Sequence, residues 1–303
     1  MKNKIYRSPL FYVGDKFKLI KEIKPYFPQN INRFIEPFVG GGSVFLNISA
    51  EEYFLNDINK NVFNLHKFLS KQAKNPLTFL SRIENIIDDY DLSKSFREDK
   101  VPIELKMEWK KTYYAKYNKV GFERLKKDYN KDEGTDHFKL YLLLIYGFNR
   151  MLRFNSNGEY NLPVGNVDFN KNVINALNDY FHLAGCKKLN WHNLDYKRFM
   201  NVIKYKENDF IYFDPPYLIT FSEYNKLWNE ENEIELLKLL DDLNEKNIKW
   251  AISNVTEYKG KVNKIFLEWS QKYHSYPIKS NYISYHDNSI KKFSEVLVIN
   301  YES

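Results

Sequence analysis

The feature that most constrains the fold is a short apolar strand that runs into three consecutive glycines. Phe34 to Glu36 is the predicted strand, Gly40 to Gly42 are the glycines, and the apolar residues after them can open a helix. This order of strand, glycine-rich turn and helix is typical of nucleotide-type binding folds, where a ligand touches the backbone of the turn. A tight turn without a ligand is the alternative. No Gly-Lys-Ser/Thr follows, which disfavours a triphosphate-binding loop.

A second constraint is a rigid, acidic corner at the end of another strand. Phe210 to Phe213 alternates aromatic and β-branched residues, which predicts a short buried strand. Pro215 and Pro216 follow Asp214, and neither proline can donate a ladder hydrogen bond. A carboxylate, a rigid carbonyl and the ring of Tyr217 are therefore expected at a strand's carboxyl end, where open α/β sheets bind ligands.

Further strand and helix patterns complete an α/β arrangement. Tyr53 to Asp57 is predicted as a second short strand, and the carboxylate of Asp57 at its end is suited to holding ribose hydroxyls. Glu230 to Lys246 is predicted as an amphipathic helix. Its apolar face comprises Ile234, Leu236, Leu237, Leu239, Leu240 and Leu243. The remaining predicted strands are Lys188 to Trp191, Lys249 to Ser253 and Glu295 to Tyr301.

From Asn61 to about Asn170 the alternation of strands and helices gives way to charged, aromatic sequence, which predicts an inserted domain. Phe138 to Ile145 is predicted as an apolar helix, and Asn157-Gly158 predicts a β-hairpin after it. Four side chains near the hairpin offer groups that read base edges in a major groove: Phe148, Asn149, Met151 and Arg153. A hairpin that only packs is the alternative.

Composition narrows the class of protein. The 303 residues are 43% hydrophobic and 17% aromatic, which predicts a folded chain, and the net charge of +7 permits a polyanionic partner. A single cysteine, Cys186, excludes an intrachain disulfide framework and a Cys-rich zinc site. His274 and His286 lack metal-ligand spacing, so no metal is expected. No run approaches about 18 apolar residues, and we expect a cytoplasmic protein that does not span a membrane.

Two motifs in this order resemble those of a known family. Glu36-Pro37-Phe38-Val39-Gly40-Gly41-Gly42 before the insertion and Asp214-Pro215-Pro216-Tyr217 after it are similar to the methyl-donor and catalytic motifs of the Dam family of DNA adenine methyltransferases (alpha group, D12 class), its T-even bacteriophage members in particular. The resemblance implies a doubly wound, Rossmann-like class I methyltransferase fold with a mixed seven-stranded sheet, formed by residues 1–60 and 171–303. Residues 61–170 would be an inserted, mainly helical target-recognition domain with the hairpin.

The resemblance also implies S-adenosylmethionine as the cofactor, S-adenosylhomocysteine as its product, and three sets of site residues. The catalytic set is Asp214, Pro215, Pro216 and Tyr217. The cofactor set is Tyr12, Lys16, Glu36, Phe38, Gly40, Gly41, Gly42, Asp57, Asp214 and Tyr224. The DNA-binding set is Phe148, Asn149, Met151, Arg153, Asn155 and Pro163.

The activity implied is methylation of the N6 amino group of a flipped adenine in double-stranded DNA, within GATC or a related short site. Phe11 stands where enterobacterial members have a base-reading lysine, and Asn166-Val167-Asp168 replaces a basic or tyrosine-containing segment, which leaves the outer base pair open. A cognate restriction endonuclease stays open as a second partner, and a monomer or weak dimer is expected. The alternatives are methylation of cytosine N4, of an RNA base or of a protein glutamine, and a catalytically silent DNA-binding protein.

Overall fold

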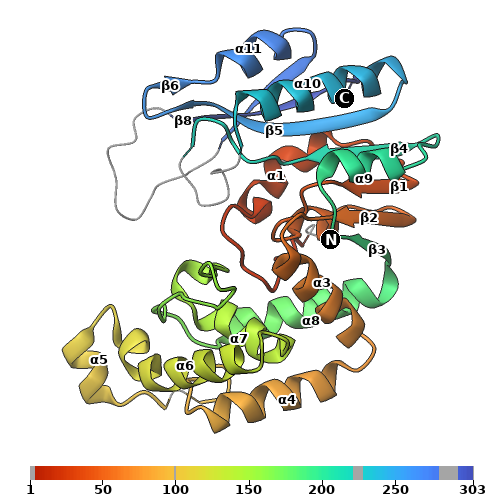
Figure 1. The fold of residues 1–303 in the computed structure, drawn as a ribbon. Coiled ribbons are helices and arrows are strands. Elements are labelled where there is room, and N and C mark those ends of the chain that lie inside the picture. Colours follow the sequence, from red (N-terminus) through yellow and green to blue (C-terminus); the bar gives the residue numbers. More distant parts are fainter. Residues whose placement is uncertain (1–3, 99, 221–227, 280–292, 303) are drawn as a thin grey trace. The chain divides into compact units, whose positions relative to one another are not determined.

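The computed structural model describes residues 4–98, 100–220, 228–279 and 293–302, and the chain divides into two compact units (Figure 1). The helical unit comprises Met1–Asp15, Gly40–Leu46 and Asn59–Lys187. The sheet unit comprises Lys16–Val39, Asn47–Ile58 and Lys188–Ser303. How these segments correspond to the expected catalytic and recognition domains stays a prediction.

One mixed sheet organises the sheet unit. Its strands are β1 (Arg33–Glu36), β2 (Glu52–Asn56), β3 (Lys188–His192), β4 (Asp209–Phe213), β5 (Lys249–Tyr258), β6 (Lys261–Val262), β7 (His274–Ile278) and β8 (Phe293–Ile299). The order is β3-β2-β1-β4-β5-β8-β7, with β6 paired to β5. The first five strands of this order are parallel, whereas β8 is antiparallel to both β5 and β7. The predicted mixed α/β sheet is confirmed, although the described residues hold eight strands rather than seven because of the two-residue β6.

Strand order places the predicted site residues of this unit along one edge. β1 pairs in parallel with β2 on one side and with β4 on the other. The carboxyl ends of these three strands therefore share an edge, and Glu36, Asp57 and Asp214 lie at or just after those ends. The point where strand order changes direction is where doubly wound sheets bind their ligands.

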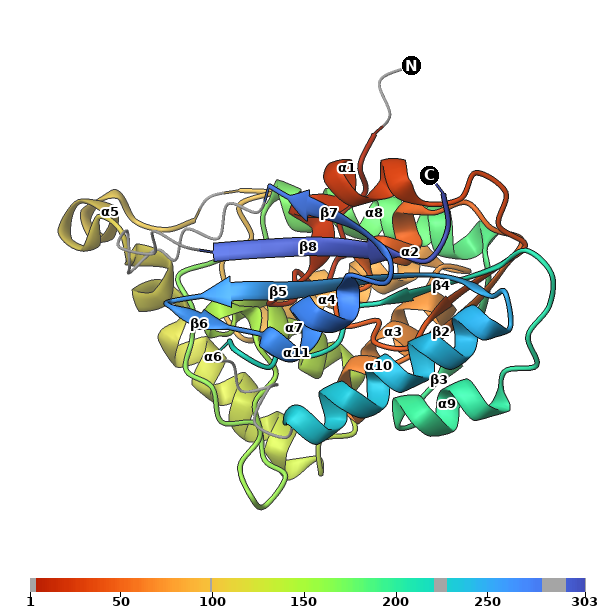
Figure 2. The ribbon, with the colours of Figure 1, turned by 90° about the horizontal axis from the view of Figure 1, so that it is seen from above.

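Both faces of the sheet are covered by residues of the same unit. Helices α9 (Tyr196–Val202), α10 (Glu230–Glu245) and α11 (Lys264–Ser270) lie on one side of the strands, and α1 (Ile20–Ile23) lies on the other (Figure 2). Two short 3-10 segments flank α1, η1 (Lys16–Leu19) and η2 (Lys24–Tyr26).

Side-chain alternation along β4 shows how the sheet is buried. Ile211 and Phe213 belong to the core cluster formed with α9, α10 and α11. Phe210 and Tyr212 instead contact Phe27, with ring centroids 4.9 and 5.3 Å apart. Because both faces are covered, β4 is buried along its whole length, which explains why its sequence is an apolar run rather than a polar alternation.

Helix α10 is confirmed, but its predicted apolar face is wrong at one position. Ile234 is 40% exposed, and Glu233 is fully buried in its place. Glu233 accepts hydrogen bonds from Trp228 Nε1 at 2.8 Å, Asn254 Nδ2 at 2.8 Å and Asn263 Nδ2 at 2.9 Å. Three donors satisfy the carboxylate, so the helix can bury an acid where periodicity alone favours isoleucine.

The described part of the helical unit consists of helices and three isolated antiparallel bridges. Its helices are α3 (Lys60–Gln72), α4 (Pro76–Asp89), α5 (Ile103–Trp109), α6 (Tyr113–Lys131), α7 (His137–Tyr146) and α8 (Lys171–Cys186), with α2 (Ser43–Asn47) after the glycines. Helix α7 confirms the predicted apolar helix and is buried from Leu140 to Tyr146. It therefore forms the unit's core.

The predicted hairpin is present as two bridges rather than as paired strands. Gly147 bridges Val164, and Phe154 bridges Tyr160. Between the bridges, η3 (Phe148–Arg150) is a 3-10 turn in which Asn149 has a left-handed φ of 52°. The η3 turn interrupts the extended backbone that a ladder of paired strands needs. The loop is therefore stabilised by the two isolated bridges and by side-chain hydrogen bonds.

Candidate active site

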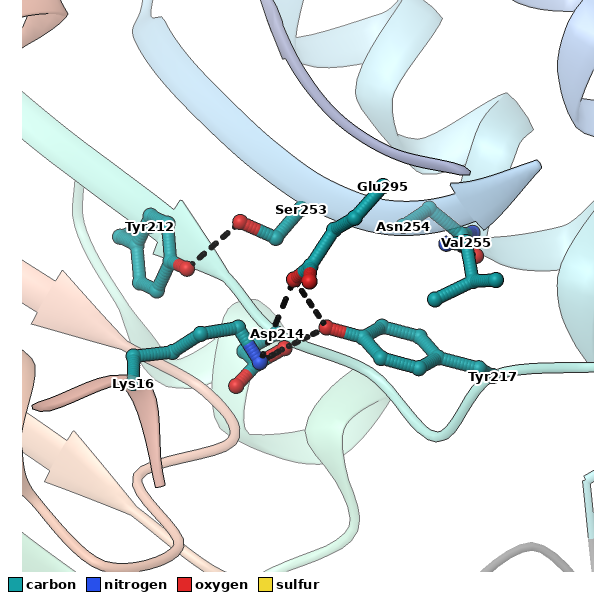
Figure 3. A network of polar contacts seen from close by, with 8 residues as sticks. All are labelled: Lys16, Tyr212, Asp214, Tyr217, Ser253, Asn254, Val255 and Glu295. Atoms are coloured by element: carbon teal, nitrogen blue, oxygen red, sulfur yellow. Dashed lines mark hydrogen bonds and ion pairs between the residues drawn. The ribbon is translucent and has the colours of Figure 1, made fainter. Parts of the chain in front are cut away.

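The corner after β4 brings one lysine and two acidic side chains together. Lys16 Nζ lies 2.7 Å from Asp214 Oδ1 and 3.9 Å from Glu295 Oε1 (Figure 3). Tyr217 donates its hydroxyl towards both carboxylates, 2.9 Å from Asp214 and 3.1 Å from Glu295. Four side chains from η1, the end of β4 and β8 thus form one network, which the sequence predicted only in part.

The charged side chains of this network differ in their exposure to solvent. The side chains of Lys16 and Glu295 are 3% and 1% exposed, whereas that of Asp214 is 18% exposed. Asp214 is therefore the charged member that an incoming ligand can reach. With both carboxylates ionised, the single ammonium leaves the cluster with net negative charge, which favours a ligand that is, or becomes, positively charged.

Glu295 is the member that sequence reasoning missed. It was predicted only as the first residue of a strand, and it lies in β8, opposite Val255 of β5. No local pattern marks it, because its contacts to Lys16 and Tyr217 join residues far apart in the chain. The sequence offered one indication, an acidic residue within a predicted apolar strand, because acidic side chains are rarely buried without a partner.

Tyr212 and Ser253 support the corner from the adjoining strands β4 and β5. Their hydroxyl oxygens are 2.7 Å apart (Figure 3). Complete burial raises the pKa of Tyr212 well above its ordinary value, and Asp214 adds to that effect. Tyr212 is thus a neutral phenol at physiological pH and a structural contact beneath the corner.

The ends of β1 and β2 hold the other predicted cofactor residues of the sheet unit. Asn56 Nδ2 donates to the carbonyls of Pro37 and Leu194 at 2.9 Å each, and Val39 N donates to Asn56 O. These bonds fix the backbone around Phe38. The Phe38 ring packs 5.2 Å from that of Tyr196, so an apolar surface lies at this edge.

Asp57 and Glu36 flank that surface. Glu36 is buried and Asp57 is partly exposed. Asn193 Nδ2 donates to Asp57 O at 2.7 Å, which orders the segment after β2. His192 stacks on Phe54 and contacts Phe199.

The glycine turn belongs to the helical unit, where side chains crowd it. Gly42 has a φ of +83°, and an added Cβ would lie 2.6 Å from the Phe45 ring and 2.7 Å from the His66 ring. At Gly41 a Cβ would lie 2.9 Å from Asp15. These two glycines are therefore required by packing as well as by any ligand.

Two residues missed by the sequence prediction support this turn. His66 is fully buried, and its Nε2 lies 2.9 Å from Gly40 O. Burial lowers the pKa of His66 to about 4, so the ring is neutral at physiological pH. Ser43 donates its hydroxyl to Asp15 Oδ2 at 2.6 Å. Tyr12, which was predicted to bind the cofactor, is buried in the same unit.

The predicted DNA-binding residues differ in their availability. Phe148 is 47% exposed and Asn149 is exposed. Arg153 donates from Nε to Asn161 Oδ1 at 2.9 Å and from an Nη to Asn161 O at 3.1 Å. Asn155 accepts from two backbone N–H groups across the Asn157-Gly158 turn, so the contacts of Asn155 order the loop itself.

Pro163 and Met151 lie beside these residues. Pro163 O accepts from Phe148 N at 2.9 Å, and Met151 is partly buried. Asn166, in the segment that departs from the family pattern, accepts from the backbone N–H of Tyr114 and Ala115 at the start of α6. In this departing segment, Asn166 therefore binds the first backbone N–H groups of helix α6.

Tyr224 and His286 lie outside the described residues. Within the described ranges, no cluster of three or more His, Cys, Asp and Glu side chains has the proximity of a metal site. The described helices also include none with the length and apolar character needed to cross a membrane.

Comparison with known proteins identifies relatives over nearly the whole chain. It is 32% identical to the modification methylase StsI of Streptococcus sanguinis and 34% identical to the type II methyltransferase M.FokI of Planomicrobium okeanokoites, in each case over 99% of this chain. It spans only 44% and 43% of those two proteins. It is 25% identical to the DNA adenine methylase of Escherichia coli K12, over 97% of this chain and 95% of that protein.

These similarities confirm the resemblance predicted from the two motifs. Residues 12–293 match the family described as D12 class N6 adenine-specific DNA methyltransferase. The match begins at Tyr12, includes both motifs and extends into β8. The chain therefore belongs to the D12 class of N6 adenine-specific DNA methyltransferases.

Proposed function

We propose that this chain transfers the methyl group of S-adenosylmethionine to the N6 amino group of an adenine flipped out of duplex DNA. The observation that carries the proposal is the corner after β4, where Asp214 alone among the charged members is within reach of a ligand. Lys16 and Tyr217 contact that carboxylate directly, and Glu295 contacts both of them. Family membership supports the same chemistry.

The carboxyl edge of the sheet fits the cofactor chemically. Phe38 offers an apolar ring, and Asp57 offers a carboxylate suited to ribose hydroxyls. The glycine turn comes three residues after β1 in the chain. At Gly40 an added Cβ would have no neighbour within 4 Å, so a ligand can approach the backbone there. When bound, S-adenosylmethionine supplies an electrophilic methyl group. Glu36, Tyr12, Lys16 and Tyr224 belong to the proposed cofactor set by sequence.

Asp214 and the Pro215 carbonyl act on the target amine. An adenine amine is a poor nucleophile because its lone pair is delocalised into the ring. Two acceptors that bind its N–H groups favour a tetrahedral nitrogen and stabilise the positive charge that grows there. The buried Glu295 adds negative charge close by, and the rigid Pro215-Pro216 backbone fixes the geometry.

The base must leave the helix to reach Asp214. Flipping costs a few kcal/mol of unstacking. Stacking on the Tyr217 ring offsets part of that cost, since each stack of a base on an aromatic side chain contributes roughly 1 to 3 kcal/mol. The two hydrogen bonds of the Tyr217 hydroxyl hold the ring in position for this contact.

For the DNA side we propose the loop that contains η3. The exposed Phe148 is suited to fill the space left by the flipped base, and Arg153 to read a guanine. Asn149, Met151, Asn155 and Pro163 complete the proposed DNA-binding set, with GATC or a related short site as the target. The names of the StsI and FokI relatives support a role in restriction-modification, with a cognate endonuclease as a partner.

Substitution of Asp214 tests the proposal. Asp214→Ala is expected to lower transfer of a tritiated methyl group to duplex DNA by about 100-fold or more, because the amine loses its charged acceptor. Asp242→Ala on the exposed side of α10 is the matched control and should leave the rate unchanged. An undiminished rate in Asp214→Ala would rule out the assigned role. Methyl transfer by the wild type to cytosine, RNA or protein would instead favour one of the alternative substrates, in which another planar amine is methylated.

A further inference from the structure

Helix α6 of the helical unit has three lysines on its exposed side. Lys116, Lys119 and Lys127 are all exposed, and their spacings of three and eight residues place them on one side of a helix. We refer to these three residues as the lysine row. The buried residues of α6 lie on the opposite side of the helix and are Asn118, Gly121, Phe122, Leu125 and Tyr129. The lysine row therefore faces solvent directly.

The charge of the lysine row is not neutralised within the described part of the chain. None of the three lysines forms an ion pair with a described acidic residue. Glu123, on the same side of the helix, lies 2.7 Å from Lys126 instead. Lys116 Nζ lies 3.6 Å from the centroid of the Trp109 ring, a contact that positions the ammonium and leaves its charge intact. This face therefore stays positive, whereas a solvated helix face usually pairs charges of opposite sign.

Side-chain hydrogen bonds join both ends of α6 to the loop that contains η3. Near the end of the helix, Asn130 Nδ2 donates to Tyr160 O at 3.1 Å, and Asn130 Oδ1 accepts from Tyr160 N at 2.9 Å. At its start, Asn166 Oδ1 accepts from the backbone N–H groups of Tyr114 and Ala115 at 3.1 and 3.3 Å. The lysine row and the loop proposed to contact DNA therefore belong to one ordered assembly within the unit.

The loop also lies beside the lysine row. Lys126 Nζ is 3.5 Å from Leu162 O of the loop, and Lys126 follows Lys119 by seven residues, about two helical turns, so both lie on the same side of α6. From Lys116 to Lys127 the row extends about 16 Å along the helix axis. Duplex DNA carries one phosphate charge per about 1.7 Å of its axis. The row is therefore long enough to meet several phosphates.

We propose that the lysine row of α6 binds backbone phosphates of the same duplex that the η3 loop contacts. The inference rests on the proposed function, because it adds a second surface to the proposed DNA interface. A lysine ammonium is a compact point charge, without the planar fork of donors that arginine offers to a base edge. Three such charges favour phosphates, and contacts of this kind orient a protein on DNA without reading its sequence.

The dependence of DNA binding on salt tests the proposal. Each phosphate that a lysine neutralises contributes about 0.9 to the slope of log affinity against log salt concentration. Fluorescence anisotropy with a labelled duplex should give a slope that is shallower by about 2.7 when Lys116→Gln, Lys119→Gln and Lys127→Gln are combined. The affinity should fall by the same factor for duplexes of different sequence. Changing the same three residues to arginine keeps the charge and should keep the slope.

Three lysines on helices of the sheet unit provide the matched control. Lys238 and Lys246 lie in and directly after α10, Lys264 lies in α11, and all three are exposed. Combined change of these lysines to glutamine removes the same charge and should leave the slope unchanged. Because every substituted position is exposed, each triple variant should keep the wild-type fold, and thermal unfolding measures this.

A wild-type slope in the lysine-row variant, or an equal decrease of slope in the control variant, would overturn the inference. Relaxed preference among DNA sequences in the lysine-row variant would also overturn it, because the lysines would then read base edges. If the wild type methylates duplex DNA while the lysine-row variant binds with wild-type salt dependence, only this inference fails. If the wild type neither binds nor methylates duplex DNA, the proposed function fails and the inference fails with it.

Discussion

Glu295 shows how one buried side chain can act on chemistry it does not touch. It accepts from Tyr217 at 3.1 Å and lies 3.9 Å from Lys16, both of which contact Asp214. Glu295 therefore helps determine how Lys16 is shared between two carboxylates. Without its charge, the ammonium would pair with Asp214 alone and compete more strongly with a substrate amine for that carboxylate.

Glu295→Gln is expected to lower kcat about tenfold with a smaller change in KM for DNA, because it removes charge without removing the hydrogen-bond acceptor. Steady-state kinetics with tritiated S-adenosylmethionine measure both constants. Tyr217→Phe is the companion variant, since it keeps the ring and removes the hydroxyl that binds Glu295. A change in KM alone would show that Glu295 affects binding rather than the transfer step.

His66 predicts a pH dependence of stability in the helical unit. Its pKa is about 4 in the folded protein against 6.5 when solvated, so the unfolded chain takes up a proton first as the pH falls. Stability is therefore fully present above pH 6.5 and is lost progressively towards pH 4, by about 3 kcal/mol in total. Urea unfolding at pH 7 and pH 5 should show a smaller difference in His66→Gln than in the wild type. Equal differences would contradict this assignment.

At the scale of elements, the glycine turn depends on two separate constraints. Gly42 combines a φ of +83° with ring atoms 2.6 and 2.7 Å from an added Cβ. Gly14 has the same φ of +83° and no neighbour within 4 Å of such a Cβ. The pair therefore separates backbone strain from steric overlap.

Gly14→Ala is expected to cost about 1 kcal/mol of unfolding free energy, from the left-handed backbone alone. Gly42→Ala should cost roughly 2 kcal/mol more, because the buried rings of Phe45 and His66 cannot move aside. Urea titration of both variants measures the difference. Similar losses in the two would show that the rings accommodate the added methyl group.

Most of the strands could be predicted from the sequence, but the edge strand β7 could not. β1, β2, β3 and β4 all start within one residue of the prediction. β1 and β4 are apolar runs that Pro37 and the Asp214-Pro215 pair end, and β2 is ended by Asp57. β7 was missed, since His274–Ile278 is largely polar and contains a proline. Among the described strands it pairs with β8 alone, at the edge of the sheet, where polar residues and proline are tolerated.

The site was predictable where a motif carries it and not where contacts join distant segments. Asp214 and Tyr217 could be placed together because they are neighbours in the chain. Glu295 and His66 could not, since their partners lie in other elements and no local spacing indicates them. Glu233 shows the same limit, because its three donors become visible only in the folded chain.

At the scale of the whole molecule, both units contain residues that the proposed activity requires. The sheet unit contains the corner after β4 and the ends of β1 and β2, whereas the helical unit contains the glycine turn and the loop around η3. The chain also spans less than half of the StsI and FokI relatives but almost all of the Escherichia coli enzyme in length. Methyl transfer by the isolated 303-residue chain is therefore the activity to measure.

The most direct test is mass spectrometry of nucleosides from duplex DNA incubated with this chain and S-adenosylmethionine labelled in its methyl group. We predict labelled N6-methyladenine, and none when Asp214→Ala replaces the wild type. Sequencing that detects methylated adenine in the same DNA should then place it in GATC or a related short site. Label in N4-methylcytosine, or no labelled nucleoside from wild-type protein that binds the duplex, would contradict the central claim.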